Sequence, residues 1–273
     1  MERKPTRFFP IFRYDSGMTN PPTELTGKTA FVTGASSGIG RAIATALGRQ
    51  GVQVVLCARR LERLEAVAES IQKAGGPEAA IVTADFFDVV EIECAIAEGA
   101  GQAGGKLDIL INSAGIGRQA KLVDGNTQDW REMLNLNVLA LAVATREALK
   151  FFPEDTGGHV VNLGSMSGHR VPGRGGFYAA TKFAVRAMTE GLRQELRLME
   201  NPTRVSSISP GFVDTELLDD YFKAGTDGAA KYEAIGYPIL QPEEIADVVL
   251  AQLKMPATAE ITDVLIRPTA QGV

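Results

Sequence analysis

A tyrosine and a lysine one helical turn apart could move a proton at neutral pH. Tyr178 and Lys182 lie in a stretch with helical periodicity, so their side chains are expected on one helix face. A tyrosine phenol has a pKa of about 10 and is a poor base at neutral pH. Because a nearby ammonium favours the phenolate, we expect Lys182 to lower the pKa of Tyr178 toward the working pH. Tyr178 could then protonate a developing alkoxide or accept a proton from an alcohol.

A serine at the end of a strand-like run could contact the same substrate oxygen. Ser165 follows the apolar run of residues 159–163 and precedes Tyr178 by thirteen residues. Its hydroxyl could hydrogen-bond the oxygen that Tyr178 protonates and help to position it. A Tyr-x-x-x-Lys pair by itself is more often an ordinary pair on a helix surface. The serine at a strand end favours a catalytic site.

A glycine-rich turn near the start of the chain could cradle phosphates. It lies between an apolar run, residues 29–33, and a helical stretch, residues 39–50. Gly34 can take the tight turn, Gly38 lets the backbone approach a pyrophosphate, and Gly40 lets the helix pack closely. The helix N-terminus would add free N–H groups and a positive dipole. A plain turn between strand and helix is the alternative. The expected cofactor contacts are Gly34, Ser36, Ser37, Gly38, Ile39 and Gly40.

The end of the next strand-like run indicates which dinucleotide binds. Folds that bind NAD carry Asp or Glu about 20 residues after the glycine turn, where it binds the ribose 2′-hydroxyl. Here Ala58 stands in that place, followed by Arg59 and Arg60. A guanidinium is a natural partner for a 2′-phosphate, so the pattern predicts NADP(H). Arg59 is the better candidate, because Arg60 could instead be solvated at the start of the next helix.

These residues must be positioned by alternating strands and helices. The expected strands are residues 29–33, 52–57, 81–84, 108–111, 159–163, 204–208 and 263–267, and the expected helices are residues 39–50, 60–74, 89–101, 127–151, 178–199 and 242–253. Continuous apolar strands alternating with helices predict a parallel sheet covered on both faces. Right-handed crossovers then give a doubly wound, seven-stranded α/β sheet, a single-domain Rossmann fold over residues 23–273.

Composition excludes several classes of function. The net charge of -5 argues against nucleic acid as a partner, and two isolated histidines argue against a metal site. No apolar run is long enough for a membrane helix. Cys57 and Cys94 suggest a reducing compartment, so we expect a cytoplasmic protein. Residues 1–22 are mildly basic and are expected to form a flexible extension; an upstream start before Met18, or an arm that docks on a neighbouring subunit, are the alternatives.

Six motifs in order make the chain resemble the short-chain dehydrogenase/reductase family over residues 25–273. They are Thr33-Gly34-x-x-x-Gly38-x-Gly40, Asn112-Ser113-Ala114-Gly115, Asn137, Ser165, Tyr178-x-x-x-Lys182 and the run from Pro210 to Thr215. The resemblance implies that Lys182 also binds the nicotinamide ribose and that Asn137 holds a water that relays protons. Ser113 departs from the second Asn of the usual motif, which affects the rigidity of the loop and not the reaction.

The resemblance also assigns cofactor contacts by position. Asp85, with Phe86 beside it, would accept a hydrogen bond from the adenine amino group. Asn112, Ala114 and Gly115 would line the ribose and the ends of the central strands. Val213 and Thr215 would meet the nicotinamide carboxamide, and Pro210 and Gly211 would complete that part of the cofactor site.

The substrate is indicated only by an apolar segment, residues 212–240, which corresponds to the family's variable lid. Its aromatic and aliphatic side chains could pack among themselves, or could line a pocket for a ketone, aldehyde or secondary alcohol. The function predicted is therefore NADP-dependent interconversion of a carbonyl and an alcohol by hydride transfer. A cofactor sensor without catalysis would usually lose Tyr178 or Lys182, and an NAD-linked enzyme would carry an acid at Ala58.

A surplus of apolar side chains on one expected helix predicts self-association. Residues 127–151 carry more of them than one face against a sheet requires: Leu134, Leu136, Val138, Leu139, Leu141 and Val143. In the family, the helices that correspond to residues 127–151 and 178–199 each pack against their copies in a second subunit, across a two-fold axis. We therefore expect a homo-oligomer, a tetramer. In the alternative, a monomer, the lid or the N-terminal segment covers these residues.

Overall fold

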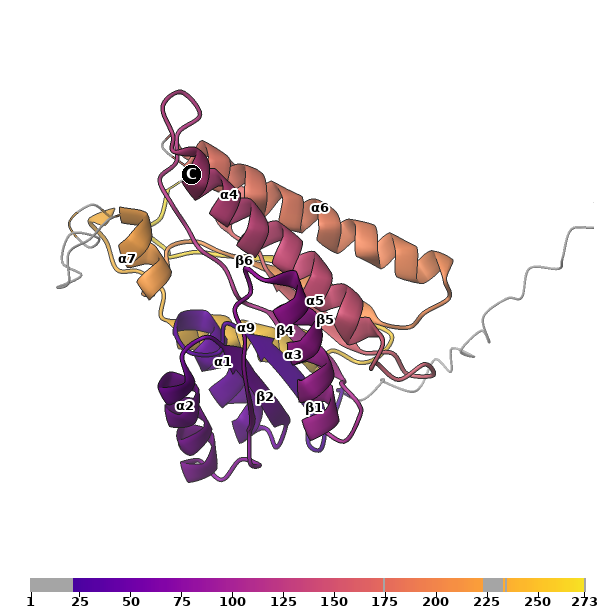
Figure 1. Ribbon diagram of the computed structural model, residues 1–273. Coiled ribbons are helices and arrows are strands. Elements are labelled where there is room, and N and C mark those ends of the chain that lie inside the picture. Colours follow the sequence, from indigo (N-terminus) through magenta and orange to yellow (C-terminus); the bar gives the residue numbers. More distant parts are fainter. Residues whose placement is uncertain (1–21, 174, 223–232, 234, 273) are drawn as a thin grey trace, which may run out of the picture.

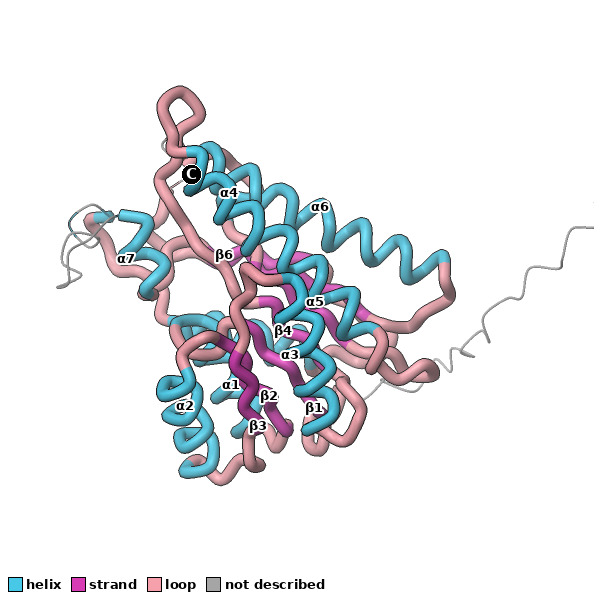
Figure 2. Tube along the Cα trace, in the orientation of Figure 1, coloured by secondary structure: helices cyan, strands magenta, loops and turns pink. Residues whose placement is uncertain are grey.

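Seven parallel strands form one twisted sheet through the middle of the chain (Figures 1 and 2). The computed structural model describes residues 22–173, 175–222, 233 and 235–272. The strand order is β3-β2-β1-β4-β5-β6-β7. The strands are β1 (Thr29–Thr33), β2 (Gln53–Ala58), β3 (Ala80–Thr83), β4 (Ile109–Asn112), β5 (His159–Leu163), β6 (Arg204–Pro210) and β7 (Asp263–Ile266). The order reverses between β1 and β4, and this is where doubly wound sheets bind ligands.

Helices cover both faces of the sheet, which confirms the predicted Rossmann fold. On one face lie α1 (Gly38–Arg49), α2 (Leu61–Lys73) and α9 (Pro242–Leu253); on the other lie α3 (Val89–Gln102), α4 (Thr127–Leu134), α5 (Ala140–Leu149) and α6 (Gly176–Leu198). Alternate strand residues supply the two cores, as the pleat requires: Ala30 and Val32 belong to one, and Phe31 to the other. No described helix is long and apolar enough to cross a membrane.

Two segments near the cleft differ from the sequence prediction. The single helix expected over residues 127–151 contains a π-helical turn, Asn135–Leu139, between α4 and α5. Such turns often occur at functional sites, and this one carries Asn137. Within the expected lid, Glu216–Phe222 forms the helix α7, which starts where Leu218 N donates to Thr215 Oγ1 at 3.4 Å. The lid residues 223–232 and 234, and the N-terminal residues 1–21, lie outside the described part of the chain.

The helix α3 approaches the sheet at a glycine. A Cβ atom on Gly99 would lie 2.6 Å from Phe31 Cε2 and 2.7 Å from Val55 Cγ1, and both of those side chains are buried. Gly101 lies two residues further on in the same helix and would meet nothing within 4 Å. An alanine at Gly99 therefore tests close packing against the sheet, whereas an alanine at Gly101 tests helix propensity alone.

We expect Gly99→Ala to lower the free energy of unfolding by about 1–3 kcal/mol, because the added methyl overpacks a rigid core. Gly101→Ala should raise it by up to about 1 kcal/mol, because alanine favours the helix. Urea denaturation of both variants measures the difference. Equal stability of Gly99→Ala and the wild type would show that the core yields at this contact.

Candidate active site

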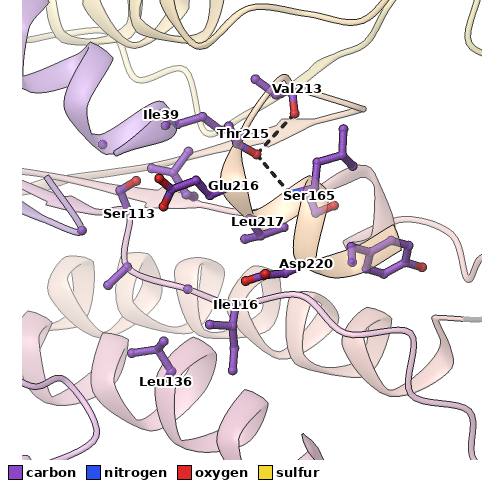
Figure 3. A pocket seen from close by; sticks show the side chains of 18 of the residues that line it. Ile39, Ser113, Ile116, Leu136, Ser165, Val213, Thr215, Glu216, Leu217 and Asp220 are labelled. Atoms are coloured by element: carbon purple, nitrogen blue, oxygen red, sulfur yellow. Dashed lines mark hydrogen bonds between the residues drawn. The ribbon is translucent and has the colours of Figure 1, made fainter. Parts of the chain in front are cut away.

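A cleft of about 430 Å³ opens at the carboxyl ends of the strands, around the point where the strand order reverses. Segments far apart in the sequence line it: the start of α1, the ends of β2, β4 and β5, the first two turns of α6, and residues 210–221. Figure 3 shows Leu217 and Asp220 of α7 between Ile39 on one side and Ile116 and Leu136 on the other. Nearly all the side chains assigned to a site by sequence meet here.

The glycine turn at the start of α1 fits the phosphates of a dinucleotide. Gly34 and Gly38 have positive φ angles of 66° and 53°, which favour glycine. At Gly40 a Cβ atom would lie 2.4 Å from Gly34 O, so no larger residue fits between turn and helix. Ser37 begins α1 without a side-chain cap, so N–H groups of the first turn remain available to an anion.

The end of β2 brings two guanidiniums to the same cleft. Arg59 lies over the ring of Phe87, with Cζ 5.9 Å from the ring centroid. Arg60 Nη2 donates to the hydroxyls of Ser36, at 3.0 Å, and Ser37, at 2.9 Å. Asp85 and Phe86 line the cleft next to this cluster. The donors needed for a phosphate are therefore grouped at one end of the cleft.

Tyr178 and Lys182 lie buried on one face of α6, at the other end of the cleft. Lys182 Nζ donates to Leu163 O at 2.8 Å and lies 5.9 Å from the centroid of the Tyr178 ring. Ser165, just past β5, lines the same end, and its Oγ accepts a hydrogen bond from Ser167 N at 3.0 Å. The three side chains predicted to share one substrate oxygen thus converge.

The expected lowering of the Tyr178 pKa is not found in this structure. Burial raises the pKa of Tyr178 to about 12, and the hydrogen bond with Ser165 opposes part of that rise. Burial also lowers the pKa of Lys182 to about 8. The sequence argument counted the attraction between ammonium and phenolate and omitted the cost of removing both groups from water, which dominates here.

Asn137 lies under the cleft and does not line it. Its Nδ2 donates to Ile116 O at 2.9 Å and to Thr181 Oγ1 at 3.1 Å, while its Oδ1 accepts from Ile116 N at 2.9 Å. Both amide hydrogens are therefore used. The side chain ties the loop after β4 to α6 beside Lys182, and the proposed water relay stays a prediction.

Asn112 was expected to line the ribose, and the structure places it elsewhere. It is buried, and its Nδ2 donates to Thr145 Oγ1 and to Asn162 Oδ1, both at 2.9 Å. It supports the strand ends from below. The other predicted residues of that loop, Ala114 and Gly115, do line the cleft, as do Pro210 and Gly211. Val213 and Thr215 line it as well (Figure 3).

Several residues of the cleft were not assigned to a site from the sequence. One of them is Gln271, close to the C-terminal end of the chain. Its Oε1 accepts a hydrogen bond from Phe212 N at 3.2 Å, although the two residues are 59 positions apart in the sequence. No spacing rule connects a C-terminal glutamine to this loop. Leu217 and Tyr221 had been noticed only as members of an apolar segment. The remaining residues that were not assigned are Ala58, Ala84, Phe87, Ser113, Ile116, Leu136, Leu163, Gly164, Met166, Ser167, Arg170, Pro172, Phe212, Glu216, Leu218 and Asp220.

Known proteins resemble this chain in sequence. The family model for short chain dehydrogenase matches residues 28–225. Dehydrogenase/reductase SDR family member 11 is 43% identical over 252 residues in Bos taurus, covering 89% of this chain and 97% of that protein. The Homo sapiens protein is also 43% identical, with 89% and 95% covered.

Solved structures agree with the sequence comparison. The closed form of serine dehydrogenase complexed with NADP⁺ superposes with a TM-score of 0.81 at 30% identity, covering 90% of this chain and 96% of that one. A short chain dehydrogenase from Burkholderia cenocepacia in complex with NADP gives 0.77 at 33% identity, covering 89% and 98%. The chain described here belongs to the short-chain dehydrogenase/reductase family.

Proposed function

We propose that the protein is an NADP(H)-dependent oxidoreductase that interconverts a carbonyl and an alcohol by hydride transfer. The observation that carries the proposal is one cleft with Tyr178, Lys182 and Ser165 at one end and Arg59 and Arg60 at the other. A bound nicotinamide would supply or accept the hydride. The protein's own residues would bind the cofactor, orient the substrate oxygen and move the proton.

The choice of NADP(H) rests on the charge at the end of β2. Ala58 offers no carboxylate to a ribose 2′-hydroxyl, whereas Arg59 and Arg60 line the cleft beside it. The solved relatives named above were described with NADP⁺ and NADP, which supports the same choice for this chain. In this proposal Arg59 binds the 2′-phosphate directly, because its guanidinium has no ion pair among the described residues.

The proton would move at the phenol of Tyr178. With a pKa of about 12, this phenol holds its proton at neutral pH, as an acid for carbonyl reduction must. Ser165 would hydrogen-bond the same substrate oxygen. Alcohol oxidation would need the phenolate, so it should be favoured at higher pH than reduction. Lys182, with its ammonium fixed on Leu163 O, would orient the cofactor ribose and favour the phenolate.

The substrate would be a small molecule that is largely apolar. Apolar and aromatic side chains of the cleft include Ile116, Met166, Leu217, Leu218 and Tyr221. The ring of Tyr221 meets that of Tyr178 edge-on, with centroids 5.8 Å apart. These side chains support a ketone, aldehyde or secondary alcohol of moderate size.

We further propose a cytoplasmic homotetramer. Of the six apolar residues singled out over 134–143, Leu134 and Leu139 remain 45% and 48% exposed, and Phe183 on α6 is 39% exposed. The helices α4, α5 and α6 run side by side along one flank of the molecule (Figure 1). Their exposed apolar side chains therefore suit pairing with a second copy of the chain. The two cysteines are free, as in a reducing compartment.

We expect Tyr178→Phe to lower kcat for carbonyl reduction by about 10²–10⁴-fold while NADPH still binds, because only the hydroxyl is lost. Tyr221→Phe, which removes another hydroxyl from the same cleft, should cost far less. Steady-state kinetics and fluorescence titration with NADPH give the two readouts. A Tyr178→Phe variant that keeps more than about a tenth of the wild-type kcat would rule out this residue as the acid.

We expect Arg59→Ala to lower kcat/KM for NADPH by about ten- to a hundredfold, because a charge-assisted contact with phosphate is lost. The value for NADH should change little. Arg41→Ala removes the same charge from the exposed face of α1 and serves as the control. Equal use of NADPH and NADH by the wild type would contradict the proposed cofactor preference.

Light scattering behind a sizing column should give a mass near four times the 29.1 kDa of one chain. Leu139→Glu should produce smaller species, because a carboxylate would be buried between the paired helices. A single wild-type species of one chain mass at micromolar protein would contradict self-association through this flank.

A further inference from the structure

A carboxylate from the segment after β6 reaches the arginines that follow β2. Glu216, the first residue of α7, lines the same cleft as Arg60, and its Oε2 accepts from Arg60 Nη1 at 2.9 Å. Its other oxygen, Oε1, pairs with Arg63 of α2. Figure 3 shows Glu216 reaching toward the side of the cleft where Ile39 and Ser113 lie. One carboxylate thus engages two guanidiniums at the end of the cleft proposed for the 2′-phosphate.

Arg60 is the centre of this cluster. Besides Glu216 it contacts the hydroxyls of Ser36 and Ser37 in the glycine turn, so it joins that turn, α2 and α7. Three of the five N–H groups of a guanidinium are enough for these contacts. The side chains of Arg60 and Glu216 are 42% and 51% exposed. Pairs this exposed are weak and can exchange partners with an anion from solution.

Glu216 carries its charge at neutral pH. Partial burial opposes ionisation, but hydrogen bonds from Arg63 and Arg60 hold the pKa of Glu216 below its usual value. A 2′-phosphate that entered this end of the cleft would bring up to two further negative charges beside the carboxylate. Phosphate oxygens are strong acceptors for a guanidinium, so phosphate and carboxylate would seek the same donors on Arg60.

We propose that Glu216 competes with the 2′-phosphate of the cofactor for Arg60 and so limits the preference of the protein for the phosphorylated dinucleotide. This inference rests on the proposed NADP(H) function. A cofactor without the 2′-phosphate leaves the contact between Glu216 and Arg60 in place. A cofactor with it displaces Glu216 from Arg60 and loosens the attachment of α7 to the start of α2, where the pair between Glu216 and Arg63 remains. Glu216 contacts Arg60 at the end of the cleft proposed for the 2′-phosphate, and its neighbour Thr215 is expected to contact the nicotinamide. Movement of Glu216 would therefore act directly on the residue expected at the nicotinamide.

The competition can be measured without turnover by using two nucleotides that differ only in the 2′-phosphate. Adenosine 2′,5′-bisphosphate and adenosine 5′-monophosphate are titrated calorimetrically into the full chain and into Glu216→Gln. The substitution keeps the size of the side chain and removes its charge. We expect the bisphosphate to bind about three- to tenfold more tightly to Glu216→Gln, the range of one or two weak ion pairs, with little change for the monophosphate.

Two further variants distinguish competition from a general effect of charge. Glu62→Gln removes one negative charge from α2 next to Arg63 in the chain, and Glu62 lies outside the lining of the cleft. It should leave the affinity for both nucleotides unchanged. In an Arg60→Ala background, Glu216→Gln should no longer tighten bisphosphate binding, because the shared partner is gone. Amide hydrogen exchange over residues 216–222 should rise with the bisphosphate and not with the monophosphate.

Each other outcome has a definite meaning. Weaker bisphosphate binding by Glu216→Gln would overturn the inference, since Glu216 would then be holding Arg60 ready for the phosphate. No change, or an equal change for both nucleotides, would also overturn it and leave the NADP(H) proposal intact. A wild type that binds the two nucleotides equally would contradict 2′-phosphate recognition itself, and the inference would fall with it.

Discussion

The ammonium of Lys182 is held out of water against the main-chain carbonyl of Leu163, the last residue of β5. A buried charge is costly unless it is hydrogen-bonded, so this contact fixes the first turns of α6 against the carboxyl end of β5. The surroundings leave little room for any other arrangement. A Cβ atom at Gly168 would lie 2.8 Å from Lys182 O, and one at Gly115 would lie 3.9 Å from Lys182 Nζ and 3.1 Å from Asn137 Oδ1. Loops from two strand ends close around this one side chain.

Beneath the cleft, three buried asparagines bind helices through threonine hydroxyls. Each asparagine Nδ2 donates to a threonine Oγ1, and each threonine hydroxyl donates in turn to a carbonyl of its own helix. The pairs are Asn112 with Thr145, Asn137 with Thr181, and Asn162 with Thr189. A threonine hydroxyl is suited to this because it donates once and still accepts. These contacts tie β4 to α5, the π-helical turn to α6, and β5 to α6.

The sequence was informative where local spacing carries the meaning. Apolar runs alternating with helical stretches were enough for the sheet, and the glycines near α1 and the Tyr178–Lys182 spacing located both ends of the cleft. The misplacement of Asn112 has a physical reason: spacing shows that a residue follows a strand, but not whether its side chain turns up toward a ligand or down toward a helix. The pKa of Tyr178 depends on burial, which exists only in three dimensions. Glu216 and Gln271 reach the cleft through contacts across long stretches of chain, which no local pattern encodes.

The contact between Arg60 and Glu216 joins residues 156 positions apart in the sequence. Closing so long a loop costs chain entropy before any contact repays it, so contacts of this kind form slowly and late. The glycine turn before α1 is made by neighbours in the chain, whereas α7 follows β6, the sixth strand along the chain, and reaches the turn only across the folded sheet. The glycine turn is thus a local structure, whereas its contact with α7 through Arg60 exists only in the complete fold.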